Sequence, residues 1–161
     1  MNNYLKGKLL FKLNINELLK KKTETTKINF CKAHLFSFKF IKFLILLLIN
    51  LKFVAFVKIF LATVLNYYNQ FVFMESNLKL VGHAFIQKRK KKYFFMNKND
   101  SMLGEIYVSK IFRNKNLATI MSLFLLNKTY NHYQNIFYVC NKDNIPSIRL
   151  AKKCGFESSE Y

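Results

Sequence analysis

The sequence predicts one α/β domain in which a mixed, mostly antiparallel β-sheet carries helices on both faces. Two runs rich in Phe and Val, residues 70–76 and 80–87, flank a turn formed by Asn77, Leu78 and Lys79, which predicts a hairpin. Residues 104–153 then follow the order strand, helix, strand, helix, which requires a parallel crossover. A chain of 161 residues fits a single domain that buries roughly two thirds of its unfolded surface.

The composition excludes a disordered chain. Hydrophobic residues make up 52% of the sequence, with only 4 Gly and 1 Pro, so enough apolar surface is available to form a core. The three cysteines, Cys31, Cys140 and Cys154, have no paired spacing. We therefore expect a reducing compartment, the cytoplasm, and no zinc or other metal site.

The formal net charge of +19 indicates a phosphate-rich partner, an anionic membrane surface or an anionic small molecule. However, Lys, Asn, Ile and Phe are enriched along the whole chain, as a coding bias would produce. A basic module that binds nucleic acid is therefore an alternative that charge alone favours.

The first part of the chain gives the weakest prediction. Residues 1–29 alternate Lys with Leu and Ile, and only a short helix over residues 15–22 is indicated. We expect a basic N-terminal segment over residues 1–23 and the domain over residues 24–161, with residues 71–157 best supported.

Residues 35–66 predict two very apolar helices that pack on the sheet, or else a membrane span over residues 43–61. That stretch has the length and hydropathy of a span. Against a span, Lys52 and Lys58 would point roughly 120° apart on one helix, so no single polar face would hold both. The two-helix interpretation is favoured, and membrane association through residues 43–66 is the alternative.

Residues 113–118 lie where the strand 104–108 has ended and a helix over 117–130 begins. Such a turn presents unpaired backbone N–H groups and the positive end of the helix dipole. Arg113 and Lys115 add charge, and the small Ala118 permits close approach. The turn therefore predicts a site for phosphate oxygens, although a plain basic helix start would look the same.

Together with the helix that follows Asn144, this turn resembles the GCN5-related N-acetyltransferase (GNAT) superfamily. The family's coenzyme motif has a strand ending in Val, then Arg or Gln, two residues, Gly, one residue and Gly or Ala. The chain matches it with Val108, Arg113, Asn116 and Ala118. The second family motif is matched by Asn144, Ser147, Leu150, Lys153, Gly155 and Phe156.

The resemblance implies transfer of an acetyl group from acetyl-CoA to an unidentified amine, by direct attack in a ternary complex. It implies that the Val108 backbone pairs with the pantetheine arm where the strands ending in Val108 and Val139 splay apart, with Asn144 near that arm. It also implies that the diphosphate is held by the N–H groups of Asn114, Lys115, Asn116, Leu117 and Ala118. Asn116 stands where the family has Gly, and Asn is the next residue to adopt the left-handed conformation.

We expect Glu105 to be the general base, since it lies three residues before Val108 on the strand that forms the floor of the family's active site. A salt bridge with a lysine is the alternative role, and a β-bulge would decide which way Glu105 faces. His83 and His34 are expected to be packed core residues. Ala151 replaces a Tyr that protonates the leaving thiolate in many family members.

The chain ends five residues after Phe156, so we expect the family's last two strands to be missing. The alternative function is a membrane-anchored or degenerate acyl-CoA-binding protein without turnover. In the anchored case the catalytic domain would lie in the cytoplasm.

Overall fold

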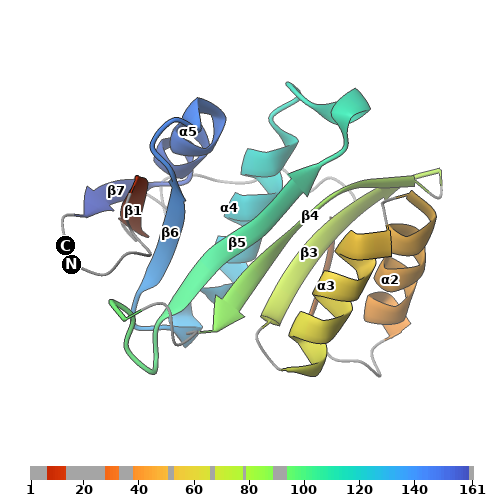
Figure 1. Cartoon of the computed structure of the whole chain (residues 1–161), viewed down its shortest axis with the longest axis horizontal. Coiled ribbons are helices and arrows are strands. Elements are labelled where there is room, and N and C mark those ends of the chain that lie inside the picture. Colours follow the sequence, from red (N-terminus) through yellow and green to blue (C-terminus); the bar gives the residue numbers. More distant parts are fainter. Residues whose placement is uncertain are drawn as a thin grey trace.

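The computed structural model describes residues 7–13, 28–32, 38–50, 53–65, 68–77, 79–88 and 94–159. In these residues the strands form one sheet in the order β2-β3-β4-β5-β6-β1-β7 (Figure 1). The strands are β1 (Lys8–Leu13), β2 (Ile28–Lys32), β3 (Tyr68–Ser76), β4 (Lys79–Lys88), β5 (Ser101–Val108), β6 (Ile136–Asn141) and β7 (Phe156–Ser159). The helices are α2 (Phe38–Asn50), α3 (Phe53–Val64), α4 (Leu117–Thr129) and α5 (Ile145–Lys153), with 3₁₀ turns η2 (Lys110–Phe112) and η3 (Tyr130–His132).

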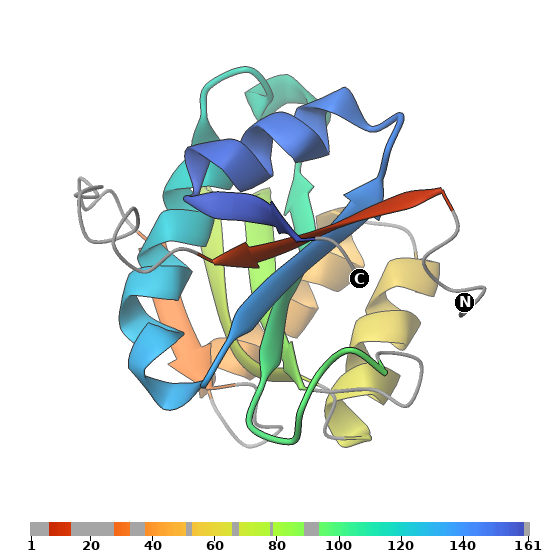
Figure 2. The same cartoon turned by 90° about the vertical axis from the view of Figure 1, so that its left-hand side faces the viewer.

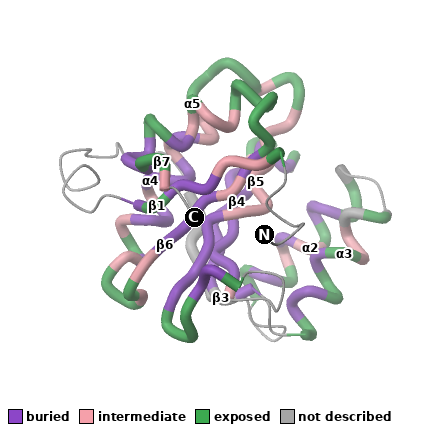
Figure 3. The backbone as a smooth tube through the Cα atoms, turned by 60° about the vertical axis from the view of Figure 1, so that its left-hand side comes forward, coloured by how far each residue is buried: buried purple, intermediate pink, exposed green. Residues whose placement is uncertain are grey.

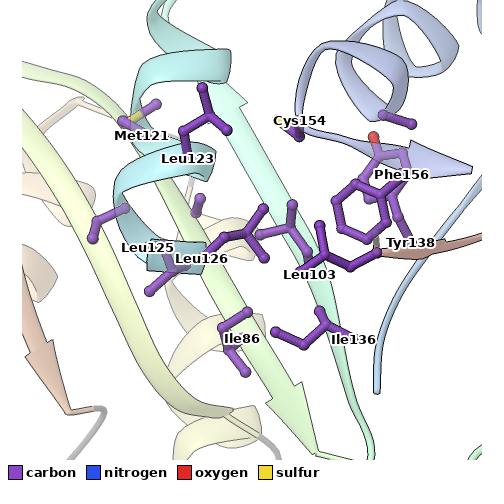
Figure 4. Packing of buried hydrophobic residues seen from close by; sticks show 14 of the residues in the cluster. Ile86, Leu103, Met121, Leu123, Leu125, Leu126, Ile136, Tyr138, Cys154 and Phe156 are labelled. Carbon is purple, nitrogen blue, oxygen red and sulfur yellow. The ribbon is translucent and has the colours of Figure 1, made fainter. Parts of the chain in front are cut away.

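Helices cover both faces of the sheet, as the sequence predicted. On one face α4 and α5 pack over a core that includes Leu103, Leu126 and Tyr138, with the side chains arranged as Figure 4 shows. On the other face α2 and α3 bury an aromatic cluster centred on Phe43 and Phe71, whose ring centroids lie 5.0 Å apart. The mixed sheet, antiparallel except for the β5–β6 pair, confirms the predicted fold class.

The predicted hairpin is present as β3 and β4, which pair antiparallel on either side of Asn77. Within it, Gly82 lets β4 approach both β5 and α4. A Cβ atom at position 82 would lie 2.5 Å from the Tyr107 carbonyl oxygen and 2.8 Å from Met121 Cε. This close approach is why a residue without a side chain occurs in the middle of a buried strand.

Residues 35–66 contain two helices, α2 and α3, which confirms the two-helix interpretation. Phe40, Phe43 and Leu47 of α2 are fully buried against the sheet. Over the part of the chain that the structure describes, no helix is long and apolar enough to cross a membrane.

The first described strand corrects two expectations about the ends of the chain. Strand β1 lies between β6 and β7, with Leu10 opposite both Val139 and Ser159, and Figure 2 shows it running between them. Residues 8–13 are therefore part of the sheet rather than of a segment outside it. A four-residue strand, β7, also begins at Phe156, where we expected both of the family's last strands to be missing. The helix expected over residues 15–22 lies outside the described residues.

Candidate active site

The two parallel strands β5 and β6 separate halfway along their length. They pair at Ser101 with Ile136, at Met102 with Phe137 and at Leu103 with Tyr138, and the parallel register ends there. Beyond it, residues 104–108 are half-buried, whereas Ser101, Met102 and Leu103 are buried. The end of β5 therefore offers backbone groups that β6 does not engage, at the splay that the sequence predicted.

The turn after β5 contains two asparagines in the left-handed region. Asn114 has φ 63° and Asn116 has φ 59°, so Asn116 does adopt the conformation that favours glycine. The Arg113 side chain folds back, and its Nε donates to the Val108 carbonyl oxygen over 3.1 Å. This hydrogen bond closes the turn onto the end of β5.

Helix α4 begins directly after this turn with its first N–H groups available. The first backbone bond of the helix runs from Ile120 N to Asn116 O, and the Asn116 side chain makes no capping hydrogen bond. The N–H groups of Leu117, Ala118 and Thr119 precede that bond. No acidic residue occurs between Glu105 and Asp143 in the sequence, so the turn can bind an anion without repulsion from nearby carboxylates along the chain.

Lys153 links the two sequence motifs. It is the last residue of α5, and its Nζ donates to Asn116 Oδ1 over 3.1 Å. At the other end of α5, Asn144 is the N-cap, where its Oδ1 accepts from Ser147 N over 3.2 Å. Ala151 is 1% exposed, so this position is part of the core between α5 and the sheet.

Glu105 lies in a β-bulge of β5. His83 pairs with Tyr107 and Phe85 pairs with Gly104, so two residues of β5 oppose the single residue Ala84 of β4. Glu105 has φ 48°, as the extra residue of a bulge can adopt. The bulge on which the orientation of Glu105 depended is therefore present. The carboxylate nevertheless reaches the helix layer at α3, where Lys58 Nζ lies 2.8 Å from Oε1, so Glu105 makes the salt bridge with a lysine that was its alternative role.

Two buried groups lie near the pair formed by Glu105 and Lys58. Burial, and then the charge of Glu105, raise the pKa of Tyr68. His83 is 4% exposed, and burial together with the Lys58 charge lowers its pKa to about 3. The His83 ring is stacked on Tyr107 with centroids 5.5 Å apart, and its Nδ1 has no hydrogen-bond partner among the described residues.

Sequence reasoning placed His83 in the core, and it is buried there. It missed Tyr68 and Lys58 as neighbours of the candidate base, and Tyr107 as a neighbour of His83. No signal near Glu105 in the sequence indicates these neighbours, because Lys58 and Tyr68 come from α3 and β3. His34 and most of the basic run at residues 88–92 lie outside the described residues.

The chain matches the model of the acetyltransferase (GNAT) family over residues 46–156. No curated protein sequence matches it. Among solved structures, an acetyltransferase of the GNAT family from Colwellia psychrerythraea is similar at 13% identity and TM-score 0.65, over 94% of this chain and 52% of that one. A tandem GNAT protein from the clavulanic acid biosynthesis pathway is similar at 15% identity and TM-score 0.67, over 94% and 50%.

A third structure matches over nearly its whole length. It is an aminoglycoside N-acetyltransferase in complex with CoA, at 14% identity and TM-score 0.57, over 84% of this chain and 94% of that one. The chain spans about half the length of the first two structures. At these identities the three likenesses describe the fold.

Proposed function

Because the chain belongs to the acetyltransferase (GNAT) family, we propose that it transfers an acetyl group from acetyl-CoA to a primary amine. One observation carries the proposal. A carboxylate on a β-bulge holds an alkylammonium group, that of Lys58, beside the stretch of β5 that β6 does not engage. This arrangement has an amine nitrogen, a proton acceptor and unpaired strand backbone in one place, as amine acylation requires.

In this proposal the diphosphate of acetyl-CoA lies at the turn 113–118. The backbone N–H groups of Asn114 to Ala118 would donate to its oxygens, and Lys115 would add charge. The left-handed asparagines, Asn114 and Asn116, favour a concave run of N–H groups of the kind that binds anions. The Val108 backbone would pair with the pantetheine arm, and Asn144 would lie near it.

The acceptor amine would take the place of the Lys58 ammonium on Glu105. The Lys58 side chain is 62% exposed, so its displacement costs little. Glu105 would accept a proton from the acceptor nitrogen, and the amine would attack the thioester carbonyl carbon. The C–N bond forms, the C–S bond breaks, and the CoA thiolate leaves to take up a proton. With Ala151 at the position of the family's Tyr, that proton would come from water.

The acceptor side of this site is aromatic as well as acidic. Tyr68 lies beside Glu105, and Tyr107 lies beside His83. Burial keeps His83 neutral at physiological pH. Aromatic faces attract organic cations. These neighbours support a cationic alkylamine as the acceptor class, and the free, buried Cys140 is compatible with the cytoplasm.

The proposal is tested by measuring CoA release from acetyl-CoA with a panel of primary amines, including polyamines and lysine-containing peptides. CoA affinity is measured by calorimetry on the same sample. We expect CoA binding together with amine-dependent thiol release. Binding without release for any amine would contradict acetyl transfer, and absence of binding would contradict the coenzyme site itself.

A further inference from the structure

The exposed large hydrophobic residues gather on one side of the molecule. Thirteen such residues occur among the described ones, and all but Phe94, Ile111 and Ile145 lie on α2, α3 or the residue that follows α3. They include Ile45 and Ile49 on α2, and Val54, Leu61 and Val64 on α3, each at least half exposed. We call this surface of the two helices the outer apolar face.

Each of the two helices is apolar on opposite sides. At about 100° per residue, Ile45 and Ile49 of α2 point away from Phe43 and Leu47, which are fully buried against the sheet. Figure 3 shows buried and exposed segments alternating along both helices. A helix on the surface of a soluble domain normally has charged or polar residues on its outer side, and monomers rarely expose a contiguous apolar patch of this kind.

Composition alone does not explain the outer apolar face. Helices α4 and α5 come from the same biased sequence, yet among their residues only Ile145 is an exposed large hydrophobic. The face also carries no negative charge, since neither α2 nor α3 contains Asp or Glu. Of the lysines on these helices, Lys42 and Lys58 turn toward Glu75 and Glu105 on the strands, and Lys39 is exposed.

We propose that the outer apolar face docks onto an anionic membrane surface, with α2 and α3 lying in the plane of the interface. Apolar side chains would enter the boundary between headgroups and acyl chains. The side chain of Lys39 on α2, which is exposed, would reach the headgroups. This proposal does not depend on the acetyl-transfer reaction.

The net charge of the chain favours a lipid surface as the binding partner of the outer apolar face. With a formal net charge of +19, two copies of the chain repel each other, whereas a membrane that contains anionic lipids attracts the chain. Helices that lie in the interface need not be long enough to cross it, so the proposal fits the lengths of α2 and α3.

The test is co-sedimentation of the full chain with vesicles of phosphatidylcholine alone or of phosphatidylcholine and phosphatidylserine in equal parts. The variant replaces Ile45, Val54 and Leu61 by Ser, which removes apolar surface and keeps every charge. The matched control replaces Phe94, Ile111 and Ile145, the exposed hydrophobics elsewhere, by Ser. We expect the wild type and the control to bind the anionic vesicles, and the variant to bind at least about tenfold more weakly.

Three outcomes would overturn the proposal. They are no binding by the wild type, equal binding by the variant and the wild type, and a lipid-free dimer in ultracentrifugation that the variant dissociates. The last would assign the face to a second copy of the chain. If circular dichroism shows that the triple variant is unfolded, Val54→Ser alone, at a position 75% exposed, replaces it with the same criteria.

Discussion

The two faces of the sheet have similar architecture but present different chemical groups. Each face is covered by two helices. On the α4 side the functional groups are backbone N–H groups at a helix start, with Arg113 and Lys115 beside them and no carboxylate nearby in the sequence. On the α2–α3 side they are side chains: the Glu105 carboxylate, the buried His83 and two tyrosines.

This difference shows how the fold could bind an anion on one face and an amine on the other. Backbone donors hold a phosphate with little dependence on side-chain identity, so that side is recognisable in a diverged sequence. A proton acceptor needs one carboxylate in one orientation, and here a single bulge in β5 supplies it. The two faces should therefore act independently, so that a substitution on one face leaves the function of the other unchanged.

The largest expected effect is on the amine side. Glu105→Gln should lower turnover about 10²–10⁴-fold, since the proton acceptor is lost, while CoA affinity stays the same. Steady-state thiol release and calorimetry measure the two quantities. The matched control is Glu75→Gln, which removes the other carboxylate that pairs with a lysine of these helices and should leave turnover unchanged. Equal losses in both variants would assign Glu105 a structural role.

On the anion side, Arg113→Glu should weaken CoA binding by roughly 1–3 kcal/mol, because a charged donor is replaced by a repelling carboxylate. Calorimetric titration with CoA measures this. Arg149→Glu places the same charge change on the exposed surface of α5 and should have a much smaller effect. Equal affinity of Arg113→Glu and the wild type would refute the site at the turn.

His83 should make stability depend on pH. Its pKa is lowered to about 3 in the folded chain, so below its ordinary value of about 6.5 only the unfolded chain takes up the proton. The contribution of the neutral His83 to the free energy of unfolding is thus fully present above about pH 6.5, and it falls as the pH is lowered toward 3. Between pH 7 and 5 the wild type should lose about 2 kcal/mol more than His83→Phe in urea unfolding. The exposed His132, changed to Gln, is the control, and an equal pH slope in His83→Phe would contradict the buried neutral histidine.

The smallest expected effect concerns the left-handed turn. Asn116→Gly should fold and bind CoA as the wild type does, whereas Asn116→Val should cost about 1 kcal/mol in unfolding free energy, because a β-branched residue is strained at φ 59°. Urea unfolding of the pair measures the difference. Indistinguishable stabilities would mean that the turn changes conformation in solution.

Local sequence signals were sufficient where the structure depends on neighbouring residues. The hairpin of β3 and β4, the start of α4 and the left-handed Asn116 follow from strand patterns, a turn and the conformational preference of asparagine. They were insufficient for β1, because Lys8 pairs with Asn141 at the far end of the chain. Nothing within residues 8–13 encodes that partner.

The same division between local and long-range signals applies to the candidate site. The anion side is a contiguous turn, so its residues could be named from sequence. The amine side is assembled from α3, β3, β4 and β5, and Lys58 appeared in the sequence only as a charge in an apolar stretch. Its partner Glu105 could be named from sequence, but the direction of its side chain depends on the register shift between β4 and β5, which involves two strands at once.

The central claim is that the coenzyme lies at the turn 113–118 and leaves the α2–α3 side open for the amine. Hydrogen–deuterium exchange of the chain with and without CoA tests it most directly. The account predicts slower exchange at the amides of residues 109–118, with the peptides of α2 and α3 unchanged. Protection of α2 and α3 with no change at residues 109–118 would contradict it.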